Sequence, residues 1–389
     1  GKRLATVTTN RLDDAALEEA VRRSEALAKL APENPEYVGE LGAQKYVATP
    51  EPQGVAGMAH DGDARAQAAA AGLDGAREAA VIAAGYVDTV ETVRAIANTK
   101  GLFAFHAGAG AAHTLTMRSP DGAASGWAGG EATVMSRLDS ARITRAAVEK
   151  CLAGRAPRDL EPGRYTAILE PTAAGMLLSR LLEHLEARDA DEGHSFFSKP
   201  GGGNRIGEAL FDARVTIESD PGIPGAEAAP FDRDDGLPRG PVRWVERGVL
   251  RKLVTSRYWA RERDVDAIAP PGNLVLSVEG ERSLDELVAS TERGVLITRF
   301  WYIRALNPRT MSYTGLTRDG TFLVEGGKVV TAVNGFRFNQ SIADLLRNLD
   351  AAGRPERVAA SESSSVGRPI LAPAMRVREF NLASRSDAV

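Results

Sequence analysis

The chain has 389 residues, enough for two or three domains that each have a core. Its formal net charge is -4 and 26% of its residues are charged, so no basic surface for direct nucleic-acid binding is indicated. The single cysteine, Cys151, excludes an internal disulfide and a zinc site made of cysteines alone, and no apolar run is long enough to span a membrane. These features predict a cytoplasmic protein without membrane contacts.

The stretch 1–48 is expected to form an N-terminal lobe. Its first residues alternate like a strand already under way and start without Met, which predicts that an upstream segment is missing. Residues 13–30 favour a helix, because Asp13 can cap it and apolar side chains such as Leu17 recur on one face.

Residues 49–155 are expected to form a central unit built on an antiparallel sheet. An Ala-rich stretch over 63–71 predicts a helix that glycines then interrupt. Between 80 and 127, β-prone runs separated by turn residues predict a meander, with one turn at 108–110.

A second capped helix is predicted from Asp139 to about Leu152. Ile143, Ala147 and Cys151 share one face of it, so the thiol is expected in the core rather than in a nucleophilic site. The proline-rich stretch 156–163 that follows predicts a linker.

The remainder, 164–389, is expected to form a β-rich C-terminal domain. The local signals predict a strand over 164–170, an amphipathic helix over 172–186, hairpins at 246–248 and 325–327, and a short helix over 342–348. The whole pattern predicts an α+β fold: N-terminal and central α/β lobes with an antiparallel sheet, followed by the β-rich domain.

The histidines give no metal-binding spacing. No pair of them matches HExxH, and the five are His60, His106, His113, His184 and His194. His106 and His113 flank the glycines at 108–110 and are expected to face each other across a hairpin, without metal. The run 201–203 is three glycines after a proline, which favours a flexible loop over an anion-binding cradle because no strand precedes it.

The strand over 298–304 carries an unusual density of aromatic and charged residues. Alternation places Arg299 on one face and Arg304 on the other, so whichever face is buried carries a guanidinium that needs an anionic partner. That partner is either an internal carboxylate or a ligand such as a peptide carboxylate. The candidate substrate-binding residues are therefore Arg299, Tyr302, Arg304, Thr317 and Arg318.

Five phrases, in order along the chain, resemble the TldD/TldE (PmbA) metallopeptidase family, whose older name is modulator of DNA gyrase. They are DLEPGRY at 159–165, SFFSKPGG at 195–202, TRFWY at 298–302, TGLTRDG at 314–320 and NGFRFN at 334–339.

The resemblance implies a zinc site in the TldD-type subunit, where an HExxxH helix supplies two histidines and a general-base Glu and a Cys near the C-terminus completes the site. Here the aligned helix has Ser179 at the first His, Arg180 at the Glu and His184 at the second His, and the run 361–368 has no Cys. One imidazole cannot hold zinc, and a guanidinium repels it. The resemblance therefore implies a TldE/PmbA-like subunit with no catalytic residues and no metal of its own.

The function expected from this resemblance is a non-catalytic subunit of a heteromeric complex. A TldD-type partner would carry the zinc, and the complex would cleave peptides, including modified peptide natural products, which bind as an added β-strand. Two alternatives remain open. One is a stand-alone, metal-independent hydrolase or amide-processing enzyme that uses His184, and the other is a protein-binding modulator of DNA gyrase or of a toxin-antitoxin pair.

Overall fold

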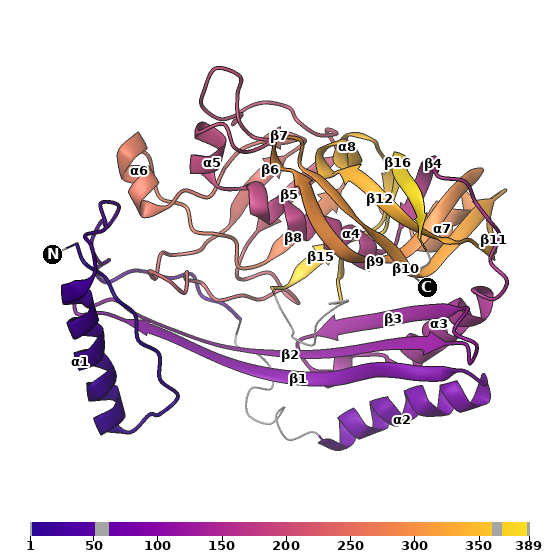
Figure 1. Ribbon diagram of the computed structural model, residues 1–389, viewed down its shortest axis with the longest axis horizontal. Coiled ribbons are helices and arrows are strands. Elements are labelled where there is room, and N and C mark those ends of the chain that lie inside the picture. The colour runs from indigo at the N-terminus through magenta and orange to yellow at the C-terminus, as the bar shows by residue number, and fades with distance from the viewer. Residues whose placement is uncertain (1, 51–61, 360–367, 387–389) are drawn as a thin grey trace.

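A long three-stranded sheet with two helices lies beneath a larger β-rich body in the computed structural model of this chain (Figure 1). The structure describes residues 2–50, 62–359 and 368–386. His60 and most of the run 361–368 lie outside these residues.

Helix α1 (Asp14–Leu30) begins where its cap was predicted, with the Asp13 carboxylate accepting a hydrogen bond from the Ala16 N–H. Its apolar face is exposed among the described residues, and Val21 on that face is 59% accessible. Residues 2–10 contribute only an isolated bridge at Arg3, so the expected strand at the start of the chain is not formed there.

The lower sheet is an antiparallel meander of β1 (Ile82–Ala97), β2 (Phe103–Arg118) and β3 (Ser125–Ala132), in that order. The meander is as predicted, but the turn at 108–110 is wrong. Those glycines lie inside β2, which pairs with β1 along its whole length. His106 and His113 therefore lie on one strand, opposite Arg94 and Val87, and do not face each other.

Helix α2 (Gly62–Glu78) continues through the glycines that were expected to interrupt it. A Cβ at Gly75 would come within 2.5 Å of the Thr144 Cγ2, and one at Gly72 would press on Leu115. These glycines therefore act as close-packing positions and not as breakers, because they let α2 approach the neighbouring helix and sheet.

Helix α3 (Ser140–Ala153) packs against β3 and β2 and is capped by Asp139 as predicted. Cys151 is fully buried in the cluster formed with Ile143 and Ala147, and burial raises the pKa of its thiol. The predicted place of this cysteine in the core is confirmed. The short 3-10 helix η2 (Met135–Arg137) connects β3 to α3.

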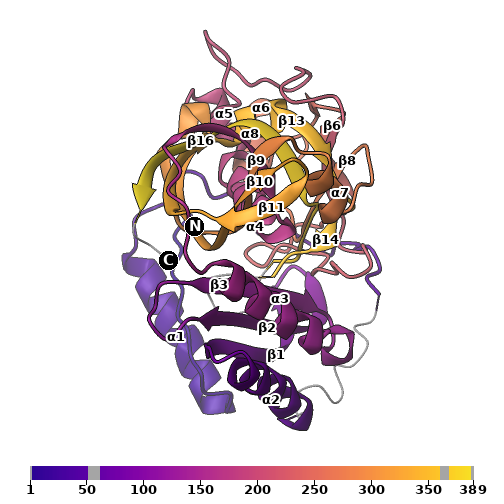
Figure 2. The same cartoon turned by 90° about the vertical axis from the view of Figure 1, so that its right-hand side faces the viewer.

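The upper body is built on a closed barrel, visible as a ring in Figure 2. Its strands are β4 (Gly163–Leu169), β9 (Arg293–Asn307), β10 (Ser312–Glu325), β12 (Gly335–Ser341) and β16 (Met375–Ser386). All neighbours are antiparallel except β4 and β9, whose parallel pairing closes the ring. Strand β11 (Lys328–Ala332) forms a hairpin with the end of β10. Strand β13 (Leu349–Ala352) pairs with β16.

A second sheet flanks the barrel, in the order β14-β15-β8-β5-β6-β7. Its strands are β14 (Glu356–Arg357), β15 (Ile370–Ala372), β8 (Leu274–Val278), β5 (Val215–Ser219), β6 (Val242–Glu246) and β7 (Val249–Leu250). The shorter helices of this body are α5 (Ala187–Asp191), α6 (Arg257–Arg263), α7 (Leu284–Ala289), η4 (Pro308–Thr310) and α8 (Ile342–Arg347).

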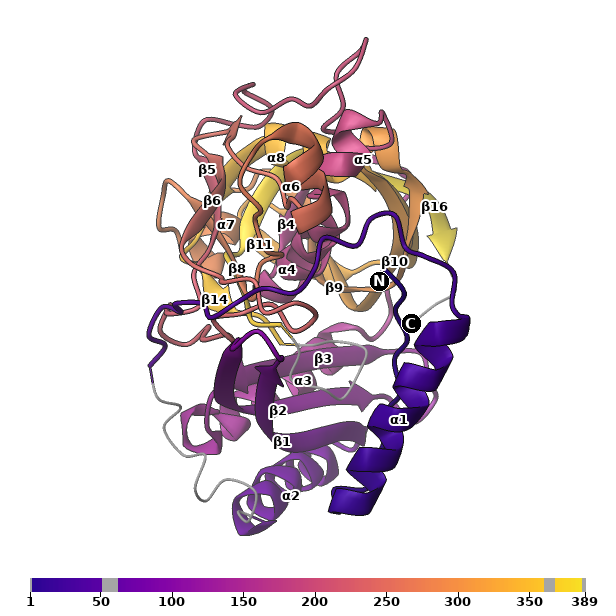
Figure 3. The same cartoon turned by 90° about the vertical axis from the view of Figure 1, so that its left-hand side faces the viewer.

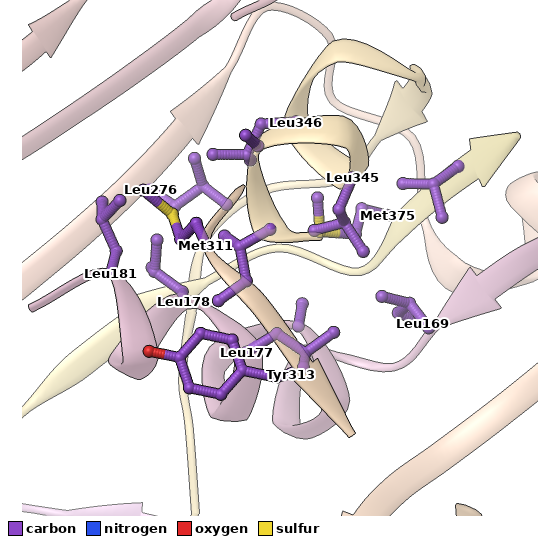
Figure 4. Close-up of a cluster of buried hydrophobic side chains, with 14 of the residues drawn as sticks. Leu169, Leu177, Leu178, Leu181, Leu276, Met311, Tyr313, Leu345, Leu346 and Met375 are labelled. Atoms are coloured by element: carbon purple, nitrogen blue, oxygen red, sulfur yellow. The ribbon is translucent and has the colours of Figure 1, made fainter. Parts of the chain in front are cut away.

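Helix α4 (Pro171–Ser179) contacts β4 and β9 of the barrel and β15 of the second sheet. This helix was predicted to be amphipathic, but it is buried on all sides because both sheets cover it. Leu177 and Leu178 lie against Met311 and Tyr313 in the main core (Figure 4).

The predicted α+β class is confirmed, with antiparallel sheets and a β-rich C-terminal part. The division at 1–48, 49–155 and 164–389 stays a prediction. Among the described residues, no helix combines the length and the apolar character needed to cross a bilayer.

Candidate functional site

The candidate site lies where the central helix ends. After Ser179 the chain tightens into the 3-10 helix η3 (Arg180–His184), so the α-helix is shorter than the predicted range 172–186. Leu181 is buried in the core and anchors this turn, while the side chains of Arg180 and Glu183 reach toward solvent. The Ser179 hydroxyl donates to the Met176 carbonyl and is thereby used within the helix.

The hydroxyl of Tyr313, from β10, is the centre of the polar cluster. It lies 2.9 Å from Glu183 Oε2 and 2.8 Å from His184 Nε2. A carboxylate can only accept, so the single phenolic proton goes to Glu183 and His184 donates to the phenol oxygen. A proton on His184 Nε2 is therefore assigned from this hydrogen bond.

Burial sets the protonation of this cluster. It lowers the pKa of His184, which favours the neutral ring. It also raises the pKa of Tyr313, and the hydrogen bond to Glu183 and the charge of that carboxylate raise it further. Both shifts favour a neutral imidazole and a neutral phenol at neutral pH.

Arg180 and Glu183 form the accessible side of the cluster. Arg180 Nη1 donates to Glu183 Oε1 at 2.9 Å, and both side chains are partly exposed. The buried Nε of Arg180 has no hydrogen-bond partner among the described residues. Because both side chains are partly exposed, the pair can offer a donor and an acceptor to a ligand at the surface.

These side chains do not match the donor set of a zinc site. Zinc in proteins takes three or four His, Cys or carboxylate ligands, whereas one imidazole is present here and its Nε2 already contacts Tyr313. Within 2–50, 62–359 and 368–386, no group of three or more His, Cys, Asp or Glu side chains is placed to hold a metal ion.

Arg299, the first of the predicted substrate-binding residues, makes its contacts within the protein. It is 6% exposed and its Nε donates to Asp319 Oδ2 at 2.8 Å, with a further hydrogen bond from Nη2. Its guanidinium also lies 5.2 Å from the ring centroid of Trp127 on β3. Of the two partners considered for a buried Arg, the internal carboxylate is the one observed.

Thr317 and Arg318 also have partners within the barrel. Thr317 is buried, and its hydroxyl oxygen accepts a hydrogen bond from the Phe336 N–H. The Arg318 guanidinium lies 5.2 Å from the ring centroid of Trp301 on β9. The structure thus brings Arg318 next to Arg299 by strand pairing, around the Asp319 carboxylate. Thr317, Arg318 and Asp319 also line a small cavity of about 70 Å³ between the barrel and the segment 123–125.

Tyr302 and Arg304 are separate from that group and lie at the surface. Tyr302 is 53% exposed and has a positive φ of 54°, and the Arg304 guanidinium lies 4.0 Å from its ring centroid. The register between β9 and β10 shifts here. This irregularity ends the predicted alternation and turns Tyr302 outward.

Sequence reasoning missed Tyr313 and Glu183 as members of the cluster. The spacing of Arg180 and Glu183 at i,i+3 was a usable signal, because such residues are neighbours on a helical turn. Tyr313 gave no such signal, since its contact with His184 joins distant parts of the chain.

A family model described as the PmbA/TldA metallopeptidase C-terminal domain matches residues 162–384, which is more than half of the chain. No curated protein sequence matches the chain.

Three solved structures share this fold, each at 20% sequence identity and over 98% of this chain. TldE from Thermococcus kodakarensis superimposes with a TM-score of 0.82 over 87% of its length. Proteins named as modulators of DNA gyrase, from Bacteroides thetaiotaomicron and Thermotoga maritima, have TM-scores of 0.81 and 0.77 over 85% and 86% of their lengths.

Proposed function

The chain belongs to the PmbA/TldA metallopeptidase family, and from that premise we propose that it is a TldE/PmbA-like subunit without a zinc ion of its own. It works in the cytoplasm with a TldD-type partner that carries the zinc. The complex cleaves peptides, and this chain helps to bind them.

One observation carries the proposal. Where the resemblance expects a zinc-binding HExxxH, this chain has the Arg180–Glu183 ion pair and a His184 imidazole bonded to Tyr313. The positive charge of the Arg180 guanidinium would repel a metal cation at this place. The His184 Nε2 is already hydrogen-bonded to the Tyr313 hydroxyl and is therefore not free to bind a metal. The helix end engages its one imidazole in a hydrogen bond and places the Arg180–Glu183 pair at the surface, which supports a binding role rather than metal hydrolysis.

The outer edge of β9 supports peptide binding. Strand β4 pairs with β9 only from Val295 to Ile297, and among the described residues no strand pairs with that edge from 298 to 307. An unpaired edge offers N–H and C=O groups to an extended peptide, and Tyr302 and Arg304 would contact its side chains. Tyr313 pairs with Ala305, so the helix-end cluster lies one strand away from this edge.

Co-expression with a TldD-type homologue tests the proposal. The expected result is a stable heteromeric complex that cleaves an unfolded peptide, loses activity with a chelator and contains zinc only in the partner. Metal analysis of each separated subunit and cleavage assays of each subunit alone are the measurements. If this chain alone binds zinc and cleaves peptides in a chelator-sensitive way, the proposal is wrong.

The hydrogen-bonded His184 and Tyr313 favour one alternative, a stand-alone amide-processing activity by acid-base catalysis. In that case the purified chain would hydrolyse a small amide with chelator present, and His184→Ala would abolish turnover. In the subunit hypothesis, the same variant leaves peptide cleavage by the complex within about twofold of the wild type, because the residue only supports the local fold.

A further inference from the structure

A second concave region lies on the upper body, beside α5 and α6, which are neighbours in Figures 1 and 3. It is a cavity of about 580 Å³ between these helices, the loop around Asn204 and the segment 251–255. This volume is within the range of small-molecule sites, about 300 to 1,000 Å³. No residue of the five family-like phrases quoted above lines it.

The floor of the cavity is apolar, and the Arg263 guanidinium lies 4.5 Å from the centroid of its Trp259 ring. Leu253 and Trp259 line it and are both buried, and the Trp259 indole N–H donates to Asp191 at 2.8 Å. Ile206 and Val265 stand at the rim and are exposed. Apolar side chains that are held in place below and exposed above provide a surface for an apolar ligand group.

Most charges that line the cavity are already paired. Asp191 accepts from Asn204 and lies 3.6 Å from the Arg263 guanidinium. Arg251 lies 3.1 Å from Glu246. Two charges remain, because among the described residues neither the Lys252 ammonium nor the Asp266 carboxylate has a hydrogen-bond or ion-pair partner.

We propose that this cavity binds a short apolar peptide with both termini free. Its carboxylate pairs with Lys252, its ammonium pairs with Asp266, and its apolar side chains lie on Leu253 and Trp259. A fatty acid would match Lys252 and the floor but would leave Asp266 without a partner. The inference rests on the proposed function, since such peptides are products of peptide cleavage.

Calorimetric titration of the complete chain with the tripeptide Leu-Leu-Leu tests the inference. We expect saturable binding, with affinity lowered about tenfold for the C-terminal amide and for the N-acetyl form, because each loses one charged hydrogen bond. Octanoate is the probe for a plain apolar acid and should bind more weakly than the free tripeptide. Equal affinities for octanoate and the tripeptide would overturn the inference, as would no tripeptide binding at millimolar concentration.

Two exposed substitutions give a matched test. Lys252→Gln should lower affinity for the free tripeptide about tenfold but leave binding of the amide unchanged, whereas Asp266→Asn should lower affinity for the free amine and not for the N-acetyl form. The control is Lys328→Gln on β11, which should change neither. Loss of affinity with the control as large as with Lys252→Gln would overturn the assignment.

The same variants separate this inference from the proposed function. Lys252→Gln should still form the complex with a TldD-type partner and support cleavage. If the complex forms and cleaves but no variant alters tripeptide binding, only the cavity assignment is wrong. If no complex forms and the tripeptide still binds in the expected pattern, the cavity assignment stands and the subunit hypothesis is wrong.

Discussion

Two polar regions, one around Arg299 and one around Arg180, differ in how far their charged side chains are exposed to solvent. Arg299 lies at the seam between the barrel and the lower sheet, where Asp319 and the Trp127 ring enclose it. Arg180 lies at the end of the central helix, where its partner Glu183 is itself half exposed. The seam also holds the Lys150–Glu170 ion pair at 2.7 Å, which joins α3 to the start of α4.

This difference separates structural from available charge. A buried ion pair is costly to break, because removing one partner leaves a charge without water or counter-charge. A partly exposed pair contributes little to stability and can exchange its partner for a ligand. Arg299 on the strand that looked most functional in the sequence therefore joins the barrel to the lower sheet, while the Arg180–Glu183 pair remains available at the surface.

Arg299→Ala is expected to have the largest effect. It should lower the free energy of unfolding by about 3 kcal/mol, because the buried Asp319 carboxylate loses its hydrogen bonds to Arg299 and keeps only the longer contact with Arg318 at 3.8 Å. Urea denaturation measures the change. The matched control is Arg304→Ala on the exposed part of the same strand, and the comparison fails if both variants lose equal stability.

Tyr313→Phe should have the second-largest effect and lower the free energy of unfolding by about 1 to 3 kcal/mol. The ring still fills the core, but the His184 N–H and the Glu183 carboxylate both lose their shared partner. Thermal or urea unfolding measures the loss. Tyr302→Phe is the control, since that ring is largely exposed; a loss as large in the control would show that the buried network adds nothing.

A pH series should isolate His184. Burial lowers its pKa below the ordinary 6.5, so below that pH the unfolded chain binds a proton that the folded chain excludes. The contribution of the neutral ring is therefore complete above pH 6.5 and falls as the pH drops toward 5.

The measurement is the difference in unfolding free energy between the wild type and His184→Gln at each pH. The difference should shrink on acidification by at most about 1.4 kcal/mol per pH unit. A difference that stays constant from pH 7 to 5 would contradict the buried neutral assignment.

Arg180→Gln should have the smallest effect on stability, below about 1 kcal/mol, because its ion pair with Glu183 is partly solvated. Urea unfolding checks this. The same variant in the complex should weaken peptide binding, measured as a raised KM with kcat unchanged, if the exposed pair contacts peptide. A stability loss equal to that of Arg299→Ala would erase the distinction between the two regions.

The parts of the fold that could be predicted are those with local causes. Asp13 and Asp139 cap their helices because capping involves only residues nearby in the chain. The glycines of α2 looked like breakers because the groups they touch, Leu115 and Thr144, belong to other elements. The short strands of the second sheet carry little periodicity, so no local pattern predicted their order.

The candidate site shows the same limit. Arg180 and His184 were named from the sequence, and the structure places both in one cluster. Tyr313 could not be assigned to them, because its approach depends on how β10 curves around the helix. Arg299 was correctly expected to need an anion, but only the positions of β9 and β10 identify Asp319 as that anion.

The closed barrel also has a consequence for synthesis. Strand β16 pairs Met375 with Leu169 of β4, so β4 has no antiparallel neighbour until residue 375 has left the ribosome. The lower sheet, in contrast, pairs only neighbours in sequence. We expect the lower lobe to fold first during translation and the apolar α4 to stay exposed until the last strand arrives, which makes that interval the one most prone to aggregation.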